Sequence, residues 1–216
     1  MQIIAFTDIH GSYKKVNEIL SKEFAYDVII LGGDLTTFGS PKEAEDAVKL
    51  FQSHGKPVLV VAGNMDPPNL EETFDRLKVS INGKAVIVGE TGFFGVSASP
   101  FSPLHTPYEI SEDEILRRAE EGWKHIQTAR WKIFVPHAPP FNTKLDRIFT
   151  AAHVGSTAVR AFIEKHQPDI AVCGHIHEAR GKDSIGKTQI VNCGAAGKGY
   201  YAAIELGETV KVKNKE

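Results

Sequence analysis

Five short, continuous apolar runs constrain this chain more than any other feature of its sequence. They lack an alternation of polar and apolar residues, which is typical of strands that are buried on both faces. The runs are Ile3–Phe6, Val28–Leu31, Val58–Val61, Ile133–Val135 and Ile170–Cys173. Strands of this kind need helices or a second sheet on each face, so the sequence predicts an α/β fold.

Amphipathic segments lie between these runs and supply the predicted helices. One of them carries Val16 and Leu20 on the same side. Two others begin with a capping box, at Ser40 and at Ser111, and a fourth ends before Pro168. The alternation of strands and helices extends over most of the chain and favours a sheet with helical connections.

Two regions contain strand-like runs without helices, at residues 79–97 and 188–213. We expect them to form a second, more antiparallel sheet. The length of 216 residues suits one domain that spans residues 1–216. Hydrophobic residues make up 42% and charged residues 24%, which excludes a disordered chain.

The charge balance excludes several classes of partner. Lys and Arg total 25, Asp and Glu total 27, and the net charge is −2, so we expect neither duplex nucleic acid nor a membrane surface as a partner. No apolar stretch approaches the ~18 residues that span a bilayer, and no signal peptide is recognisable. Cys173 and Cys193 lie in apolar runs and are expected to be reduced thiols of a cytoplasmic protein. The oligomeric state stays open, and a homo-oligomer is compatible with the sequence.

Polar side chains of types that commonly bind metals follow each of the five runs, at the point where the predicted strand ends. The segments are Asp8-Ile9-His10, Gly33-Asp34, Gly63-Asn64, Pro136-His137 and Gly174-His175-Ile176-His177. Ligands bind at the carboxyl edge of open α/β sheets. Single instances have ordinary explanations, since an aspartate after a strand is commonly a helix cap and Gly-Asp is commonly a turn. Packing alone does not require histidine there, so we interpret the five together as a functional site.

The complete donor set is large enough for two adjacent metal ions that share one carboxylate. It consists of Asp8, His10, Asp34, Asn64, His137, His175 and His177. Mixed nitrogen and oxygen donors suit Mn, Fe, Ni, Zn or Co rather than Ca or Mg. Two divalent cations outweigh two aspartates and a bridging hydroxide by one charge, which favours a small phosphate ester as substrate.

The same motifs, in the same order, resemble the signature of the calcineurin-like metallophosphoesterases. The resemblance runs from Asp8 to His177. The stretch from His137-Ala138-Pro139-Pro140 onward is similar to prokaryotic members related to cyclic-nucleotide phosphodiesterases. The family implies a four-layer αββα sandwich of two mixed sheets flanked by helices.

The resemblance also implies roles for the donors. Asp8, His10 and His177 would hold the first ion, Asn64, His137 and His175 the second, and Asp34 would bridge both. The implied reaction is hydrolysis of a phosphodiester by a metal-bridging hydroxide, with Asp34 and Asn64 in catalytic positions. Cyclic nucleotides and other small diesters are the candidate substrates.

One position departs from the family pattern. Where the family usually has histidine near the leaving-group oxygen, this chain has Met65, followed by Asp66. Methionine can neither donate a proton nor carry charge, and members that lack the histidine tend to favour diesters. We expect Met65 either to fill space or to contact substrate, and Asp66 to orient His10 from behind the metal site.

Two further histidines lie on long loops and are candidates to supply the missing acid. His105 belongs to the loop of residues 97–110 and His153 to that of residues 138–156. For His105 the simpler interpretation is a solvated imidazole, and for His153 the two interpretations stay open. In the same loop Asp146 and Arg147 either contact substrate or pair with each other.

Two alternatives come with the fold. A non-catalytic scaffold for protein partners would have lost metal ligands, and this chain has lost none. A nuclease would need a basic groove, whereas the clustered lysines are Lys211, Lys213 and Lys215 near the end of the sequence. A broad phosphomonoesterase would reveal itself by its ester preference.

Overall fold

The computed structural model describes residues 1–23 and 25–216. The helices are α1 (Tyr13–Lys22), α2 (Pro41–Gln52), α3 (Leu70–Arg76), α4 (Glu112–Lys124) and α5 (Thr157–His166), with short 3-10 turns η1 (His177–Ala179) and η2 (Ala196–Lys198). The strands are β1 (Gln2–Phe6), β2 (Val28–Gly32), β3 (Val58–Val61), β4 (Ala85–Val88), β5 (Thr91–Val96), β6 (Ser99–Pro100), β7 (Glu109–Ile110), β8 (Trp131–Pro136), β9 (Ile170–Cys173), β10 (Gly181–Ile185), β11 (Thr188–Asn192), β12 (Tyr201–Leu206) and β13 (Val210–Lys215).

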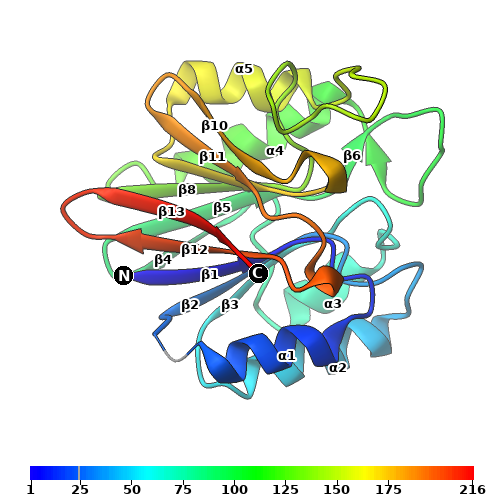
Figure 1. Ribbon diagram of the computed structural model, residues 1–216, viewed down its shortest axis with the longest axis vertical. Coiled ribbons are helices and arrows are strands. Elements are labelled where there is room, and N and C mark those ends of the chain that lie inside the picture. Colours follow the sequence, from blue (N-terminus) through cyan, green and yellow to red (C-terminus); the bar gives the residue numbers. More distant parts are fainter. Residues whose placement is uncertain (24) are drawn as a thin grey trace.

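Two large sheets lie face to face, and helices cover their outer faces (Figure 1). One sheet has the order β13-β12-β1-β2-β3 and the other β10-β11-β9-β8-β5-β4. Successive residues of β1 point to opposite faces, so Ile4 and Phe6 pack against α1, α2 and α3, while Ile3 and Ala5 pack between the sheets. Helices α4 and α5 pack on the second sheet around Phe94. The predicted four-layer αββα sandwich is confirmed.

The helix boundaries follow their local signals. Ser40 Oγ accepts a hydrogen bond from the Glu43 N–H at 3.2 Å, and Ser111 Oγ accepts one from the Glu114 N–H at 3.2 Å. Helix α5 ends at His166, and the left-handed φ of 51° at the next residue, Gln167, stops the helix before Pro168.

The expectation that residues 79–97 and 188–213 form a second, more antiparallel sheet is confirmed only in part, because a second sheet is present but these residues are divided between the two sheets. Strands β4, β5 and β11 join β8 and β9, whereas β12 and β13 join the first sheet. Strand β12 pairs antiparallel with β1, and Ile3 lies opposite Ile204. Both sheets are therefore mixed, because each adds antiparallel edge strands to a parallel centre.

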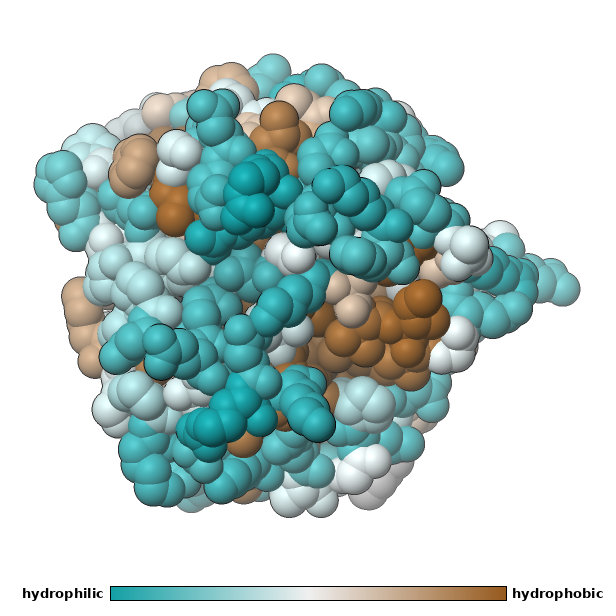
Figure 2. Space-filling view, turned by 180° about the vertical axis from the view of Figure 1, so that it is seen from behind, coloured by the Kyte–Doolittle hydropathy of each residue, from teal (hydrophilic) through white to brown (hydrophobic). Residues whose placement is uncertain are grey.

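Viewed from behind, the surface carries an apolar patch beside the polar tip of the β12–β13 hairpin (Figure 2). Strand β4 forms the sheet edge on this side, where Ile87 is 52% exposed. Cys173 and Cys193 are buried and free, as predicted. In the described part of the chain, no helix has both the length and the hydrophobicity that crossing a bilayer requires.

Candidate metal centre

The seven predicted donors converge at the carboxyl ends of strands from both sheets. Asp34 lies at the middle of the cluster. Its Oδ2 atom is 3.5 Å from Nε2 of His10 and 3.5 Å from Nε2 of His137. Asp34 follows β2 in the first sheet and His137 follows β8 in the second, so the two sheets meet at this edge.

The other donors form two groups on either side of Asp34. The outer group consists of Asp8, His10 and His177, and the inner group of Asn64, His137 and His175. In the outer group, His177 Nε2 is 3.3 Å from Asp8 Oδ1, and the rings of His10 and His177 are 5.3 Å apart. In the inner group, Asn64 Oδ1 is 3.0 Å from His137 Nε2 and 2.8 Å from His175 Nδ1.

These separations fit divalent metal ions. Two donors that bind one ion at ~2.0–2.2 Å lie roughly 3–3.6 Å from each other. The donor separations of 3.3 Å in the outer group and of 2.8 and 3.0 Å in the inner group are close to this range. Asp8, His10 and His177 place one ligand atom each within 4.8 Å of one another, and so do Asp8, Asp34 and His137. The residue types and the spacing therefore both suit a pair of metal ions.

Backbone geometry brings the donors this close. Asp8, His10, Asp34 and His175 have left-handed φ values between 47° and 67°, which non-glycine residues adopt mainly where the surrounding structure enforces them. A Cβ on Gly63 would lie 2.0 Å from Asp34 Oδ1, and one on Gly174 would lie 2.3 Å from Asp8 Oδ2. The glycines before Asn64 and His175 are thus needed for close approach.

Main-chain groups orient the two aspartates. The Met65 N–H donates to Asp34 Oδ1 at 2.8 Å, which leaves Oδ2 directed at the two histidines. The His175 N–H donates to Asp8 Oδ1 at 2.9 Å. Met65 thus contributes to the site through its backbone, a role that the sequence did not indicate.

Asp66 does not orient His10, contrary to expectation. Its Oδ2 accepts the N–H groups of Leu35 and Gly63 at 3.0 and 2.9 Å, and Oδ1 accepts the N–H and hydroxyl of Thr36 at 2.8 Å each. The carboxylate is fully buried and engaged with these donors, so it ties the Asp34 loop to the Asn64 loop.

Thr37 is the residue beside His10, because its Oγ1 lies 3.0 Å from His10 Nδ1.

A second residue that the sequence did not reveal is Asn192 on β11. Its Nδ2 donates to the carbonyls of Ile176 at 2.9 Å and of Leu145 at 3.3 Å. Asn192 therefore joins the loop of His175 and His177 to the loop after β8.

The charges of the cluster shift one another's pKa values. Burial opposes ionisation of Asp8, but the hydrogen bond with His177 and the charge of His137 hold the pKa of Asp8 below its usual range. Burial also disfavours a charged His137, yet the Asp34 carboxylate raises the pKa of His137 to about 9. Burial and repulsion from Asp34 raise the pKa of Asp66 to about 6. The carboxylates and the imidazoles thus balance one another's charges, and a metal ion that binds here would displace protons from the imidazoles.

The two groups differ in exposure. The His10 and His177 side chains are 26% and 39% exposed, whereas the His137 side chain is completely buried. Asn64 is 5% exposed. The histidines of the outer group thus face solvent, whereas His137 and Asn64 of the inner group lie against the protein interior.

His153 is held by a buried carboxylate. Its Nδ1 lies 2.7 Å from Asp146 Oδ1, and its side chain is 28% exposed. Asp146 also accepts the N–H groups of Thr143 and Gly155 at 2.9 and 3.1 Å. Asp146 therefore pairs with His153, and Arg147 is exposed.

His105 lies exposed at the tip of the loop between β6 and β7, where its N–H donates to the Ser102 carbonyl at 3.3 Å. His105 takes no part in the contacts described above among the seven donors. Met65 is half-buried, and its N–H is bound to Asp34.

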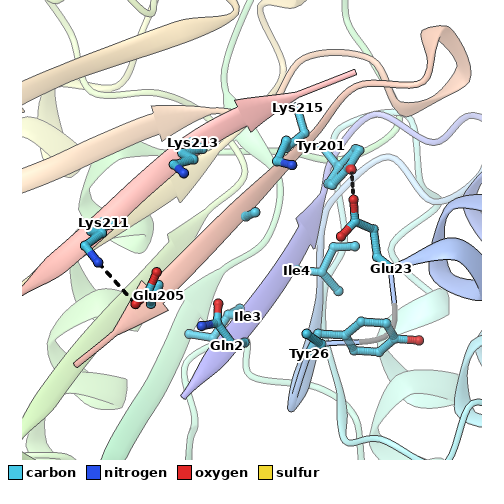
Figure 3. A pocket seen from close by; sticks show the side chains of 12 residues that line it. Gln2, Ile3, Ile4, Glu23, Tyr26, Tyr201, Glu205, Lys211, Lys213 and Lys215 are labelled. Atoms are coloured by element: carbon cyan, nitrogen blue, oxygen red, sulfur yellow. Dashed lines mark hydrogen bonds and ion pairs between the residues drawn. The ribbon is translucent and has the colours of Figure 1, made fainter.

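A hollow on the surface of β1, β12 and β13 is separate from the donor cluster (Figure 3). The clustered lysines lie on β13 along this hollow: Lys211, Lys213 and Lys215. Lys211 pairs with Glu205 at 3.3 Å. Lysines on an edge strand discourage pairing with another chain, and these do not line the metal centre.

Comparison with known proteins identifies the class. A sequence profile of the calcineurin-like phosphoesterases matches residues 1–179. The chain therefore belongs to the calcineurin-like phosphoesterase family. Members of this family use a dinuclear divalent metal centre, and the family together with the donor cluster supports a metal-dependent phosphoesterase.

Individual relatives share the sequence or the fold of this chain. The chain is 34% identical over 197 residues to "Uncharacterized protein MJ1162" of Methanocaldococcus jannaschii, which covers 89% of this chain and 87% of that protein. The crystal structure of TT1561 of Thermus thermophilus superposes with a TM-score of 0.78 at 16% identity, covering 99% and 98% of the two chains. A dimetal phosphatase from Danio rerio gives a TM-score of 0.67 at 11% identity, with coverage of 99% and 95%. At these identities the two structures show a shared fold.

Proposed function

We propose that the protein is a dinuclear metal-dependent phosphodiesterase. The observation that carries this proposal is the position of Asp34 Oδ2, which lies 3.5 Å from a histidine of the outer group and 3.5 Å from a histidine of the inner group. A carboxylate in this position suits a bridge between two ions. In this proposal the outer group holds one ion and the inner group the other, with Mn, Fe, Ni, Zn or Co as candidates.

The bound ions would supply a positive clamp for phosphoryl oxygens and a water of lowered pKa. The chain contributes preorganisation. The N–H groups of Met65 and His175 hold Asp34 and Asp8 in fixed orientations, so the negative charges need not reorganise during the reaction. Asn64 adds a neutral oxygen donor, which keeps the site positive enough to attract a phosphate ester.

The side chain of Met65 favours diesters over monoesters. A monoester brings a second negative charge, and a methionine beside the centre offers neither charge nor a proton to stabilise it. A diester carries one negative charge and needs less stabilisation. Small diesters, including cyclic nucleotides, are therefore the proposed substrates.

The ester preference is tested on protein loaded with Mn. Elemental analysis should find two ions per chain, and kcat/KM should be higher for bis-p-nitrophenyl phosphate than for p-nitrophenyl phosphate. Met65→His should increase monoester hydrolysis, whereas the matched control Met65→Leu should not. Absence of bound metal would overturn the dinuclear site, and a monoester preference of the wild type would overturn the diester assignment.

His153 is the proposed proton donor for poor leaving groups. Asp146 fixes the orientation of its ring through Nδ1, which leaves Nε2 to act, and a base oriented by a carboxylate is a recurrent catalytic arrangement. His153→Ala should slow diesters with an alkoxide leaving group by about 100-fold but leave p-nitrophenyl diesters much less affected, since nitrophenolate departs without a proton. Equal losses for both substrates would contradict this role.

A further inference from the structure

Exposed apolar side chains gather on the loops beyond the metal centre. Among the described residues, six large apolar side chains are exposed on loops after β2, β6 and β8, and we call them the apolar rim. They are Phe38 (63% exposed), Phe101 (71%), Leu104 (81%), Phe141 (36%), Phe149 (91%) and Val154 (40%). The other two exposed ones, Leu50 on α2 and Ile87 on β4, lie on regular elements. Single exposed hydrophobic residues are ordinary, but these six lie on loops that follow the carboxyl ends of strands in the two sheets, which is the edge that carries the donors.

The rim adjoins the donor cluster. Phe38 follows Asp34 by four residues and Phe141 follows His137 by four, so neither Cα lies more than about 14 Å from that of the donor. The Phe38 N–H donates to the Met65 carbonyl at 3.0 Å. The loop that carries Phe101 and Leu104 is attached through the Tyr108 N–H, which donates to the Asn64 carbonyl at 3.0 Å. These loops lie on the side of the molecule where the strands of both sheets have their carboxyl ends (Figure 1).

Each loop of the rim is fixed by a carboxylate. Glu109 accepts hydrogen bonds from the N–H and hydroxyl groups of Ser102 and Thr106 at 2.7–3.2 Å. Asp146 fixes the loop after β8, and Asp66 fixes the loop after Asp34. The apolar tips are thus presented by loops with internal hydrogen bonds, which lowers the entropy cost of binding to them.

We propose that the substrate is an amphiphilic phosphodiester, whose phosphoryl group lies at the donor cluster and whose alkyl or acyl chain lies on the apolar rim. This inference rests on the proposed function. A cation-binding site that is bordered by apolar side chains is complementary to a charged phosphate that carries a hydrocarbon chain. The most exposed rim side chains, Leu104 at 81% and Phe149 at 91%, protrude into solvent, which suits an alkyl or acyl chain laid across them better than a base bound in a cleft.

The reaction for such a substrate is a simple hydrolysis. The oxygen of water bonds to phosphorus, one phosphorus–oxygen bond breaks, and the leaving group departs as an alcohol or phenolate. The products are an alkyl phosphate monoester, the released alcohol or phenolate and one proton where a phenolate is formed.

The test compares methyl and octyl p-nitrophenyl phosphodiesters with the metal-loaded full chain. For the wild type, kcat/KM for the octyl ester should exceed that for the methyl ester by about tenfold or more, since each buried methylene favours binding. Leu104→Ser and Phe149→Ser, on two different loops, should bring this ratio toward one. The controls Leu50→Ser and Ile87→Ser should keep the wild-type ratio, and all variants should keep the wild-type Tm.

The outcomes separate this inference from the proposed function. A wild type that hydrolyses both esters equally well would overturn the apolar rim as a substrate site and leave the phosphodiesterase intact. No hydrolysis of either ester would overturn the phosphodiesterase itself. Rim variants that change the molar mass in light scattering but keep the octyl-to-methyl ratio would make the rim a contact between copies and would also overturn the inference. A rate that saturates below the critical micelle concentration identifies single amphiphiles as substrate, and one that rises above it identifies a lipid surface.

Discussion

The outer and inner groups of the metal centre contain similar donors in different surroundings. Both groups include two histidines whose rings lie 5.2–5.3 Å apart. The outer histidines are partly open to solvent, whereas His137 in the inner group is sealed between β8 and the Asp34 loop, with its Nδ1 3.0 Å from the Gly32 carbonyl. The inner position is therefore expected to hold its ion more firmly, and the outer position to exchange its ion and to receive the substrate.

The largest loss of activity is expected for a substitution of Asp34, the residue that the two groups share. Asp34→Asn removes the charge that both groups share while keeping the shape of the side chain. We expect kcat/KM to fall by more than about 100-fold, because changes in residues that merely support metal ligands already cost 10–100-fold. The measurement is diester hydrolysis together with the metal content. Asp46→Asn, on the exposed surface of α2, is the matched control, and near-wild-type turnover of Asp34→Asn would place the active site elsewhere.

The next effect distinguishes the two groups directly. His177→Ala and His137→Ala should each lower the metal content from two ions toward one and remove most activity. Added imidazole should restore activity several-fold in His177→Ala, because that position is 39% exposed, but not in His137→Ala, where the side chain is completely buried. Equal rescue of both variants would show that the difference in exposure has no functional consequence.

The sequence predicts the donors of both groups because their chemistry leaves few alternatives. A single aspartate after a strand can be a helix cap or part of a turn, but packing does not require histidine, aspartate and asparagine at the ends of five strands, so their joint placement is informative. The strand order has no such local signal, since β12 returns to β1 through contacts such as Gln2 with Glu205. The pairing of His153 with Asp146 depends on a turn within the loop after β8, in which Arg147 lies opposite His153, and no turn motif in the sequence marks it.

The error concerning Asp66 has the same origin. A buried carboxylate beside a metal site has several possible partners, and only the folded chain shows that it meets N–H groups of the Asp34 loop while Thr37 meets His10. Side-chain orientation behind a site is set by tertiary contacts, which motif spacing does not encode.

Thr37 offers a smaller perturbation that is confined to the outer group. Thr37→Ala removes the hydroxyl 3.0 Å from His10 Nδ1, so the ring loses a contact that sets its orientation. We expect the affinity of the more weakly bound ion to fall by about tenfold, with little change for the other ion. Competition with a chelator measures both affinities. Thr37→Ser keeps the hydroxyl and should behave as wild type, and a matching loss in Thr37→Ser would assign the effect to packing.

The smallest effect is expected at Glu109, whose carboxylate stabilises the loop that is attached to Asn64 of the inner group. The hydrogen bonds from Ser102 and Thr106 outweigh the cost of burial and lower the pKa of Glu109 to about 2, from an ordinary value of 4.5. A carboxyl whose pKa is lowered by folding stabilises the folded loop above pH 4.5, and this contribution is lost as the pH falls toward 2.

Hydrogen exchange of the Ser102 and Thr106 amides measures this stabilisation. Their protection factors in the wild type should decline between pH 4.5 and 2, relative to those of amides in β2. Glu109→Gln should show reduced protection at neutral pH and a weaker dependence on pH, because the charge that accepts four hydrogen bonds is absent at every pH. The loop amides and the β2 amides losing protection together would show that the carboxylate of Glu109 does not stabilise the loop independently. The position of the loop beside the inner group would then depend on the Tyr108 contact with Asn64.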